Sequence, residues 1–237
     1  MSDHIVRSYD KELEVLGRKI AEMGGIAEKM LSDAMDALAE YDNDLALATV
    51  AADARLDALQ RDIEDQAIMT IARRQPMAVD LREIVAAIRV SGDLERVGDL
   101  AKNIAKRAVK LANEPHIPRA IVGLKSMHET AAMLLKDALD AYALRDAARA
   151  RQVWTNDAEL DALEDSVFRD LLTFMMEDPR NISFCTHLLF CSKNIERIGD
   201  HSTNIAETVV YLVTGETLPM DRPKGPSPLS NPPQRTV

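Results

Sequence analysis

The sequence predicts an all-α protein of six long helices, arranged as two tandem three-helix bundles that are related by an internal repeat. Three observations predict this fold: apolar residues recur at helical spacing, prolines stand between the long segments, and the second half of the chain repeats the first. Apolar residues three and four positions apart lie on one side of a helix, and no segment alternates apolar and polar residues over the length of a strand. Narrow apolar stripes on long helices are typical of bundles.

Prolines and short polar turns set the helix boundaries. Proline ends a helix near the residue before it, and Pro76, Pro118 and Pro179 each stand between two segments. Asp44 and Asp146 are the expected N-caps, because an aspartate before a helix accepts hydrogen bonds from its first N–H groups. The expected helices are 4–41, 44–74, 77–113, 118–144, 146–177 and 181–214.

The segments carry apolar residues at bundle-like spacing. In the second segment the stripe runs through Leu56, Leu59, Ile63, Ala67 and Ile71. In the third it runs through Val90, Leu94, Val97, Ala101, Ile104, Ala108 and Leu111. In the fifth it runs through Leu160, Leu163, Val167, Leu171 and Phe174. In the sixth it runs through Cys191, Ile195, Ile198, Ser202, Ile205, Val209 and Leu212. Methionines that fit helical core positions are Met23, Met30, Met35, Met69, Met175 and Met176.

Composition and charge exclude several classes of protein. The 237 residues include 29 basic and 39 acidic side chains, a formal charge of −10, which argues against a nucleic-acid partner. The longest stretch without a charge, 181–192, has 12 residues, whereas a bilayer span needs roughly 20. The start of the chain has no secretory signal, and Cys185 and Cys191 suit a reduced core. We therefore expect a cytoplasmic protein without membrane insertion.

The chain divides into three parts. Residues 1–114 form the first three-helix repeat and 115–217 form the second. Six of the ten prolines fall in the last 19 residues, so 218–237 is expected to be a disordered, proline-rich tail.

The internal repeat is the most informative feature. Asp33, Asp36, Asp53 and Asp57 recur 104 residues later as Asp137, Asp140, Asp157 and Asp161. Further on, the offset becomes 101, and the stretches 90–109 and 191–210 are identical at nine of 20 positions. Both stretches contain the pattern E-R-x-G-D-x-x-x-N, and both keep a glycine inside the helix, Gly98 and Gly199, at a cost of about 1 kcal/mol relative to alanine.

The repeated acids form two candidate metal sites. Glu95 and Asp99 lie one turn apart on the side of the third helix opposite its apolar stripe, and the matching pair is Glu196 and Asp200. Antiparallel packing would bring acid pairs of the preceding helices to face them across a groove, with the rows of oxygens facing water. These facing acids are Asp53, Asp57, Asp157 and Asp161.

Carboxylates at such close range repel one another, so a counter-ion is expected. Oxygen ligands without a nearby cysteine favour a hard ion such as Mg, Mn, Ca or Fe over structural zinc.

Other interpretations of these residues remain open. Acid pairs are common on exposed helical faces, and the repeat can preserve the fold alone. Arg96 and Arg197 fit ion pairs with neighbouring acids, and His201 fits an ordinary exposed position on a polar face. A di-iron enzyme in a helical bundle is an alternative, but it needs Glu-x-x-His pairs directed into the core, and no histidine has a glutamate three residues before it. A phosphate-binding protein is another, and it would need bound cations to reverse the charge of the groove.

Specific stretches resemble one known family. The sequence ARRQPMAVDLR at 72–82, the repeated DLERVGD and NIERIGD at 93–99 and 194–200, and FMMED at 174–178 are similar to the PhoU family over about residues 5–215. The resemblance implies two three-helix bundles, with divalent or ferric metal ions (Mg, Mn, Fe or Zn) held by E/D-x-x-x-D motifs. By position, the motif falls on Glu95 with Asp99 and on Glu196 with Asp200.

The resemblance also implies a function without catalysis. PhoU proteins are regarded as negative regulators of the phosphate-starvation response and of phosphate uptake. They act as scaffolds between the ATPase of the phosphate ABC transporter, PstB, and the sensor histidine kinase, PhoR. A homodimer, located in the cytoplasm and reaching the inner face of the membrane through its partners, is expected on the same ground. The sequence shows no nucleotide-binding loop and no kinase or hydrolase signature, so we expect no enzyme.

Overall fold

The computed structural model describes residues 2–77, 79–112, 114 and 117–219, and it confirms the expected all-α fold. The helices are α1 Ser2–Glu40, α2 Asn43–Arg74, α3 Val79–Leu111, α4 Pro118–Leu144, α5 Ala147–Glu177 and α6 Ile182–Thr214. A short 3-10 turn, η1 Pro179–Asn181, leads into α6. The disorder expected for the proline-rich tail falls almost entirely on 220–237, outside the described residues.

Aspartates and left-handed residues define the ends of the helices. Asp146 caps α5, as expected, by accepting hydrogen bonds from the N–H groups of Ala148 and Arg149. The N-cap of α2 is Asp42 and not Asp44, because the side chain of Asp42 accepts from Leu45 N, while Asp44 lies in the first turn. At their C-terminal ends, α2 is capped by Gln75 and α4 by Arg145. Both residues adopt the left-handed conformation, which satisfies the last carbonyl groups of the helix.

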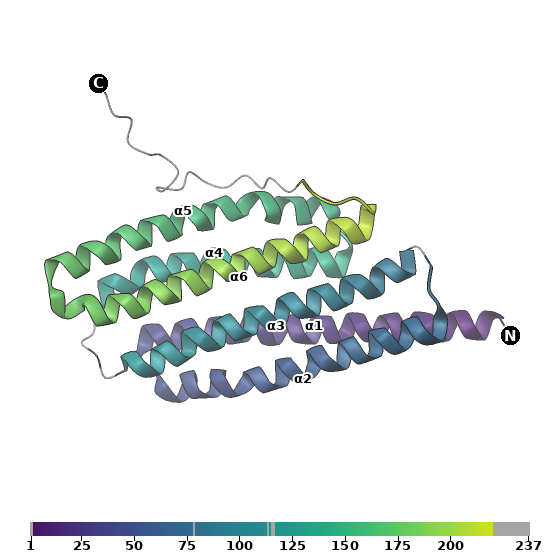
Figure 1. Ribbon diagram of the computed structural model, residues 1–237, viewed down its shortest axis with the longest axis horizontal. Helices are drawn as coiled ribbons and strands as arrows, with labels where there is room; N and C mark the ends of the chain where they lie inside the picture. The colour runs from purple at the N-terminus through teal and green to yellow at the C-terminus, as the bar shows by residue number, and fades with distance from the viewer. Residues whose placement is uncertain (1, 78, 113, 115–116, 220–237) are drawn as a thin grey trace, which may run out of the picture.

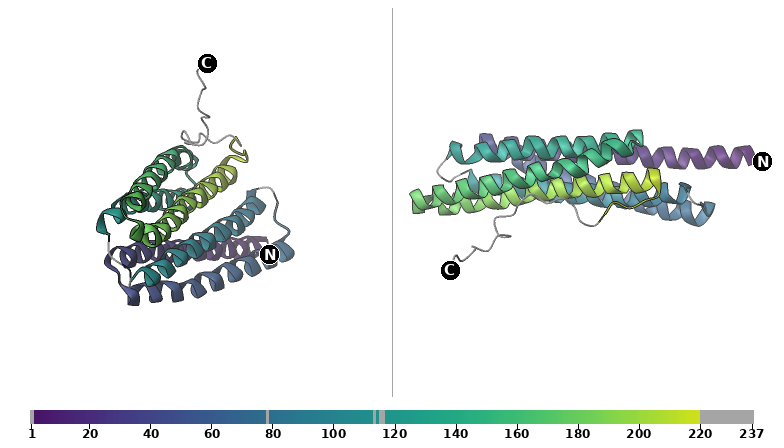
Figure 2. Two further views of the ribbon diagram at one scale, coloured as in Figure 1. Left: turned by 60° about the vertical axis from the view of Figure 1, so that its left-hand side comes forward. Right: turned by 90° about the horizontal axis from the view of Figure 1, so that it is seen from above.

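The six helices run up and down along the long axis of the molecule in two stacked groups of three (Figure 1). Each group is one sequence repeat, α1–α3 or α4–α6, and Figure 2 shows the two groups lying side by side along their length. The repeats meet where α3 packs against α6 and α1 packs against α4. Since α2 and α5 contact only helices of their own repeat among the described residues, they form opposite edges of the molecule.

One continuous hydrophobic core fills both repeats. The stripes expected for the third and sixth helices are buried along their whole length, from Val90 to Leu111 and from Cys191 to Leu212. Both cysteines, Cys185 and Cys191, are buried free thiols, in agreement with the sequence. The periodicity therefore identified the faces that hold the repeats together.

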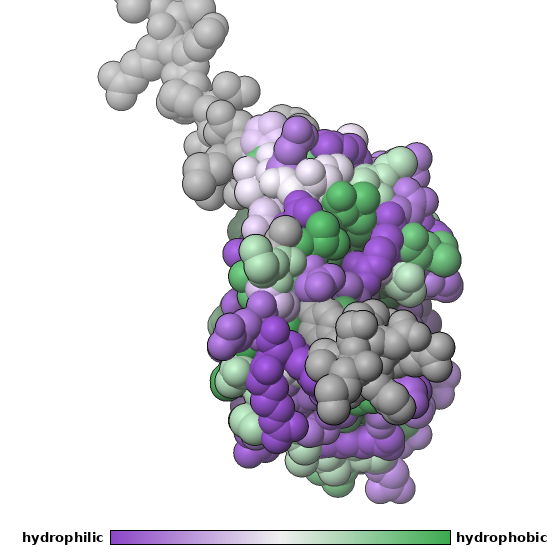
Figure 3. Space-filling view, turned by 90° about the vertical axis from the view of Figure 1, so that its right-hand side faces the viewer, coloured by the Kyte–Doolittle hydropathy of each residue, from purple (hydrophilic) through white to green (hydrophobic). Residues whose placement is uncertain are grey.

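Some apolar side chains stay on the surface near the turn between α2 and α3. They are Ile68, Met69, Met77, Val79 and Leu81. Figure 3 faces this end of the molecule and shows hydrophobic residues as separate green areas among purple ones. The core positions expected for Met69 and for Met176, near the end of α5, are therefore wrong, because 47% and 85% of their surfaces are exposed. Within the part of the chain that is described, no helix has the length and apolar character to cross a membrane.

Candidate functional site

The eight predicted acids lie in two matching seams between neighbouring helices. The first seam contains Asp53 and Asp57 of α2 with Glu95 and Asp99 of α3. The second seam contains Asp157 and Asp161 of α5 with Glu196 and Asp200 of α6. The pKa of Glu95 is raised above its usual value, mainly by burial. The charge of Asp99 raises it further, as do the charges of Asp57 and Asp53. The structure thus brings the acids of the first seam close enough to interact across the two helices.

The expected exposure of these acids to water is wrong for part of each seam. Asp53 retains 8% of its accessible surface and Asp157 only 2%. Each stands three residues before a buried leucine, Leu56 or Leu160, and therefore on nearly the same side of its helix. The side chains of Glu95 and Glu196 are also largely covered, with 19% and 15% exposed. The acids line the contact between two helices and do not stand out from the surface.

The repeated glycines permit this close contact. A Cβ on Gly98 would collide with Cδ2 of Leu56, and a Cβ on Gly199 would collide with Cδ2 of Leu160. At Gly199 the added atom would also come within 2.8 Å of Asp157 Oδ1. The absence of a side chain at these two glycines therefore lets α3 and α6 approach their partner helices beside the acids.

A lysine that the sequence analysis did not single out lies in the first seam. Lys102 Nζ is 2.6 Å from Asp53 Oδ2 and 2.5 Å from Asp99 Oδ1, so that it links α3 to α2. Burial opposes its charge, but the hydrogen bonds to Asp53 and Asp99 outweigh burial and raise the pKa of the Lys102 ammonium. Arg96 adds weaker pairs to Glu95 at 3.5 Å and Asp99 at 3.6 Å, as its position suggested.

The second seam contains two further charged groups. Lys193 Nζ lies 2.8 Å from Glu196 Oε1 on the same helix. Burial raises the pKa of Glu164, and the charges of Glu196 and Asp161 add to this against the opposing charge of Lys193. The sequence does offer a signal for Glu164, because it continues the row of Asp157 and Asp161 along α5 at helical spacing.

Two oxygen atoms in the seams are suited to a metal ion. Among the described residues, Asp53 Oδ1 and Glu196 Oε2 are buried without a hydrogen-bond partner. A buried carboxylate oxygen left without a donor is costly, and a cation would satisfy it. No group of three or more His, Cys, Asp or Glu side chains in the described ranges is already arranged around one point, so the ligands would have to converge on an ion.

Next to the first seam, a cleft of about 570 Å³ opens between α3 and α6. Its lining includes Glu95 of the seam and the pair formed by His201 Nδ1 and Asp93 Oδ1, which lie 2.9 Å apart. The exposed position expected for His201 is therefore wrong: its side chain is 17% exposed, because α3 of the first repeat covers it. Arg89 of α3 stacks on the ring of Tyr211 of α6 at 5.4 Å in the same cleft.

Sequence comparison relates the chain to proteins of phosphate transport. The model of the PhoU domain family matches residues 20–108 and 124–209. A phosphate-specific transport system accessory protein PhoU homolog of Rhizobium meliloti is 53% identical over 222 residues, which are 93% of each chain. A protein of the same description from Caulobacter vibrioides is 50% identical over 94% of this chain and 97% of its own.

Solved structures give the same relationship. The crystal structure of PhoU from Pseudomonas aeruginosa matches with a TM-score of 0.85 at 38% identity, over 88% of this chain and all of that one (100%). The phosphate transport system regulatory protein PhoU from Streptococcus pneumoniae matches with a TM-score of 0.81 at 27% identity, over 90% of this chain and 100% of its own.

Proposed function

Because the chain belongs to the PhoU family, we propose that it is an accessory protein of a phosphate-specific transport system and a negative regulator of the phosphate-starvation response. The observation that carries this proposal is the similarity over both repeats to relatives described as accessory proteins of that system. Those relatives are described as accessory or regulatory proteins and not as enzymes, which supports a scaffold without catalysis.

The scaffold would act in the cytoplasm, as a homodimer, between the transporter ATPase PstB and the sensor kinase PhoR. A protein whose core forms one continuous body can present long, rigid helical faces to two partners at once. In phosphate-rich medium the complex would hold the kinase in its inactive state and restrain uptake.

The second part of the proposal is that the seams bind divalent or ferric ions such as Mg, Mn, Fe or Zn. Asp53, Asp57, Glu95 and Asp99 would supply the oxygen ligands of the first seam. Asp157, Asp161, Glu196 and Asp200 would supply those of the second. The unsatisfied oxygens Asp53 Oδ1 and Glu196 Oε2 support this, one in each repeat. A bound ion would supply positive charge that draws two helices together. The close packing of the helices at Gly98 and Gly199 would orient the ligands.

The alternative of a di-iron enzyme gains no support from the burial of the acids. The two buried carboxylates among the described residues, Asp53 and Asp157, belong to different repeats and to helices on opposite edges of the molecule. A di-iron site would need several carboxylates together in the core of one bundle.

Deletion of the gene tests the regulatory role. We expect a reporter of phosphate-starvation genes to become active in phosphate-rich medium and to be repressed again by a plasmid copy of the wild-type gene. Co-purification from the complemented strain, with tagged protein, should recover the transporter ATPase and the sensor kinase. Normal repression in the deletion strain would refute the regulatory role.

Metal analysis of the purified protein tests the seams. After removal of metal with EDTA and dialysis, incubation with Mn²⁺ should load the protein, and replacing Glu196→Gln together with Asp200→Asn should lower the bound metal. Glu159→Gln is the matched control, because Glu159 lies on α5 between Asp157 and Asp161 but points to solvent. Equal metal content in all three proteins would contradict the proposed ligands.

A further inference from the structure

The charges of α3 and α6 are separated along the length of the two helices. All five acids of α3 lie before residue 100, and all three acids of α6 lie after residue 195. The stretches 100–111 and 182–195 therefore contain no carboxylate, although the chain as a whole has a formal charge of −10. The cations of these two stretches are Lys102, Lys106, Arg107, Lys110 and Lys193.

The fold places these two stretches side by side. The helices α3 and α6 pack against each other and run in opposite directions, so the end of α3 meets the beginning of α6 (Figure 1). Arg107 lies at this contact: its Nη1 is 3.2 Å from His187 Nδ1, and its Cζ is 4.2 Å from the centre of the Phe190 ring. Neither helix contributes an acid to this half of the junction between the repeats.

Several cations of this region have no acid partner. Lys102 and Lys193 are bound to acids of the two seams, and the charge of Glu114, beyond the end of α3, reaches His187. In the part of the chain that the structure describes, four other cations form no ion pair: Lys106, Arg107, Lys110 and Arg197. We call these four residues, together with Phe190, the basic face.

Arg107 lacks the anion that its charge requires. Its side chain is half-buried, its Nη1 bonds a neutral imidazole, and its Nε is buried without a hydrogen-bond partner. A covered cation without an anion is costly, and a guanidinium group binds a carboxylate through two parallel hydrogen bonds. Beside it, 51% of the surface of Phe190 is exposed. The basic face thus offers a charged anchor and an apolar anchor next to each other.

We infer that the basic face docks an acidic, amphipathic helix of a partner protein, with Arg107 and Phe190 as its anchors. This rests on the proposed scaffold role and names the surface that one partner would use. Arginine and aromatic residues dominate the binding energy of protein interfaces, and an amphipathic helix binds by placing its apolar side on such a surface. The carboxylates of that helix would meet Lys106, Lys110 and Arg197, which are exposed.

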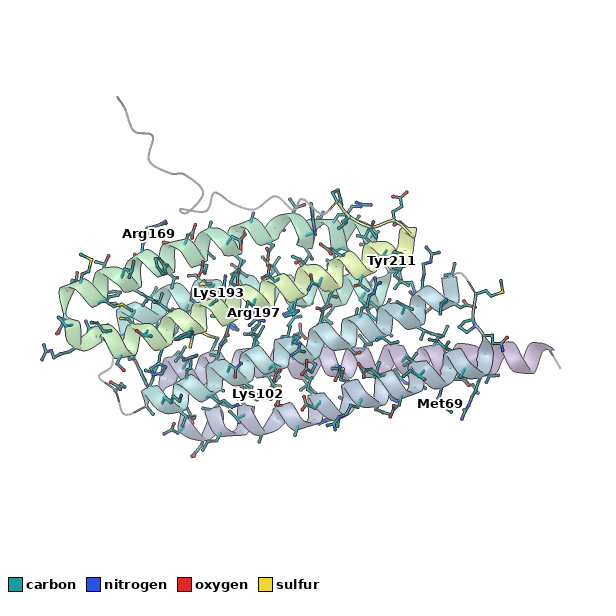
Figure 4. The ribbon with its side chains drawn as sticks, in the orientation of Figure 1. Met69, Lys102, Arg169, Lys193, Arg197 and Tyr211 are labelled. Carbon is teal, nitrogen blue, oxygen red and sulfur yellow. The ribbon has the colours of Figure 1, made fainter. Side chains whose placement is uncertain are left out.

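The same residues fit an anionic membrane less well. A membrane-binding surface projects apolar side chains into the bilayer, whereas the ring of Phe190 lies against the guanidinium group of Arg107. In Figure 4 Arg197 lies between α6 and α3. The planar guanidinium groups of both arginines match the geometry of a carboxylate. A protein segment is therefore the occupant that these contacts favour.

Co-purification of tagged variants from the deletion strain tests this surface. Lys106→Glu with Lys110→Glu reverses two exposed charges and should lower the recovery of the transporter ATPase or of the sensor kinase by roughly tenfold or more, because like charges would face each other. Phe190→Ala should lower the recovery of the same partner several-fold.

Controls separate the surface from the total charge. Arg151→Glu with Arg169→Glu changes the formal charge by the same amount at two exposed positions of α5 and should recover both partners. Figure 4 shows Arg169 on the outer side of α5, away from α3. Arg197→Glu reverses a charge on α6 and repeats the test should the first pair fail to fold by circular dichroism. In a flotation assay, vesicles of phosphatidylcholine and phosphatidylserine should not retain the wild-type protein.

Each contrary result would overturn the inference in a different way. Recovery of both partners at the wild-type level by Lys106→Glu with Lys110→Glu, or an equal loss in the α5 control, would overturn the docking surface while the scaffold role stands. Flotation of the wild-type protein that the same pair of substitutions abolishes would identify a membrane as the occupant instead. Recovery of neither partner by the wild-type protein would overturn the scaffold role and the docking surface with it.

Discussion

His187 and Arg107 show how one hydrogen bond fixes a protonation state. Arg107 Nη1 lies 3.2 Å from His187 Nδ1, and a guanidinium group can only donate, so Nδ1 must accept and the imidazole must be neutral. Burial lowers the pKa of His187 below its ordinary 6.5, and the charges of Arg107 and Lys110 lower it further. The charge of Glu114 acts in the opposite direction. Protonation would break a bond between α6 and α3.

We therefore expect acid to weaken the fold at this contact. Between pH 6.5 and the lower pKa of the folded state, the unfolded chain binds more protons than the folded one, so stability falls as the pH falls through this range. His187→Gln keeps an acceptor that does not titrate and should flatten the profile of melting temperature between pH 7.5 and 5.

His128 should contribute to the same profile. It is partly buried in α4, its pKa is lowered mainly by burial, and it should contribute in the same direction. The double variant with His128→Gln should therefore be flatter than either single one. A His187→Gln profile that parallels the wild-type profile would show that this contact does not sense pH.

At the scale of the helix, the glycines of the seams set how closely two helices pack. Gly98→Ala should destabilise the protein by about 1 kcal/mol, because overpacking a tight contact costs about 1–3 kcal/mol and alanine returns about 1 kcal/mol of helix propensity. The atom that must yield, Leu56 Cδ2, belongs to a fully buried side chain. Urea denaturation followed by circular dichroism measures the difference.

Gly92 provides the control on the same helix. Nothing lies within 4 Å of a Cβ added at Gly92, so Gly92→Ala should gain about 0.5–1 kcal/mol from helix propensity alone. The two substitutions are chemically identical and six residues apart in α3, yet they should shift stability in opposite directions. Equal shifts would mean that the contact with Leu56 does not limit the approach of α2.

Features of a single helix could be predicted from the sequence, whereas contacts between two helices could not. Prolines and polar turns located the six helices, and spacing located the buried faces of α3 and α6, because each stripe is a property of one helix. The sequence predicted that Asp53 faces a groove open to water and not that it is buried in the contact, since burial depends on how closely α3 approaches. Lys102 was missed for a related reason: its stem reaches a carboxylate on a different helix, and no pattern within one helix records that.

Across the whole molecule, polar and aromatic pairs join the repeats at successive levels of the contact between α3 and α6. Arg89 stacks on Tyr211 at one level, and Arg107 meets His187 at another. Between them, Asp93 Oδ1 accepts from His201 Nδ1 at 2.9 Å and from Asn204 Nδ2 at 3.2 Å. Asp93 is thus the acceptor shared by two groups of the other repeat.

Asp93→Ala should cost about 1–3 kcal/mol of stability, because it leaves the largely covered His201 without its acceptor and also removes the bond to the exposed Asn204. Asn103→Ala is the control, since Asn103 is exposed on the same helix and its removal should change stability by less than about 0.5 kcal/mol. Chemical denaturation of both variants at pH 7.5 measures the difference. Equal stability of the two would show that the Asp93 contacts contribute little to the junction.

The continuous core predicts that both repeats unfold together. Internal repeats often unfold separately when each has its own core, but here one hydrophobic cluster extends through both.

Trp154, the single tryptophan, lies in α5 and donates its indole N–H to Glu207 of α6 at 3.0 Å, so its fluorescence reports on the second repeat alone. Circular dichroism reports on all six helices. In urea and EDTA the two signals should give one midpoint and one slope. A fluorescence midpoint displaced from that of circular dichroism would mean that the junction of α3 with α6 opens before either bundle melts, and the repeats would then act as separate bodies.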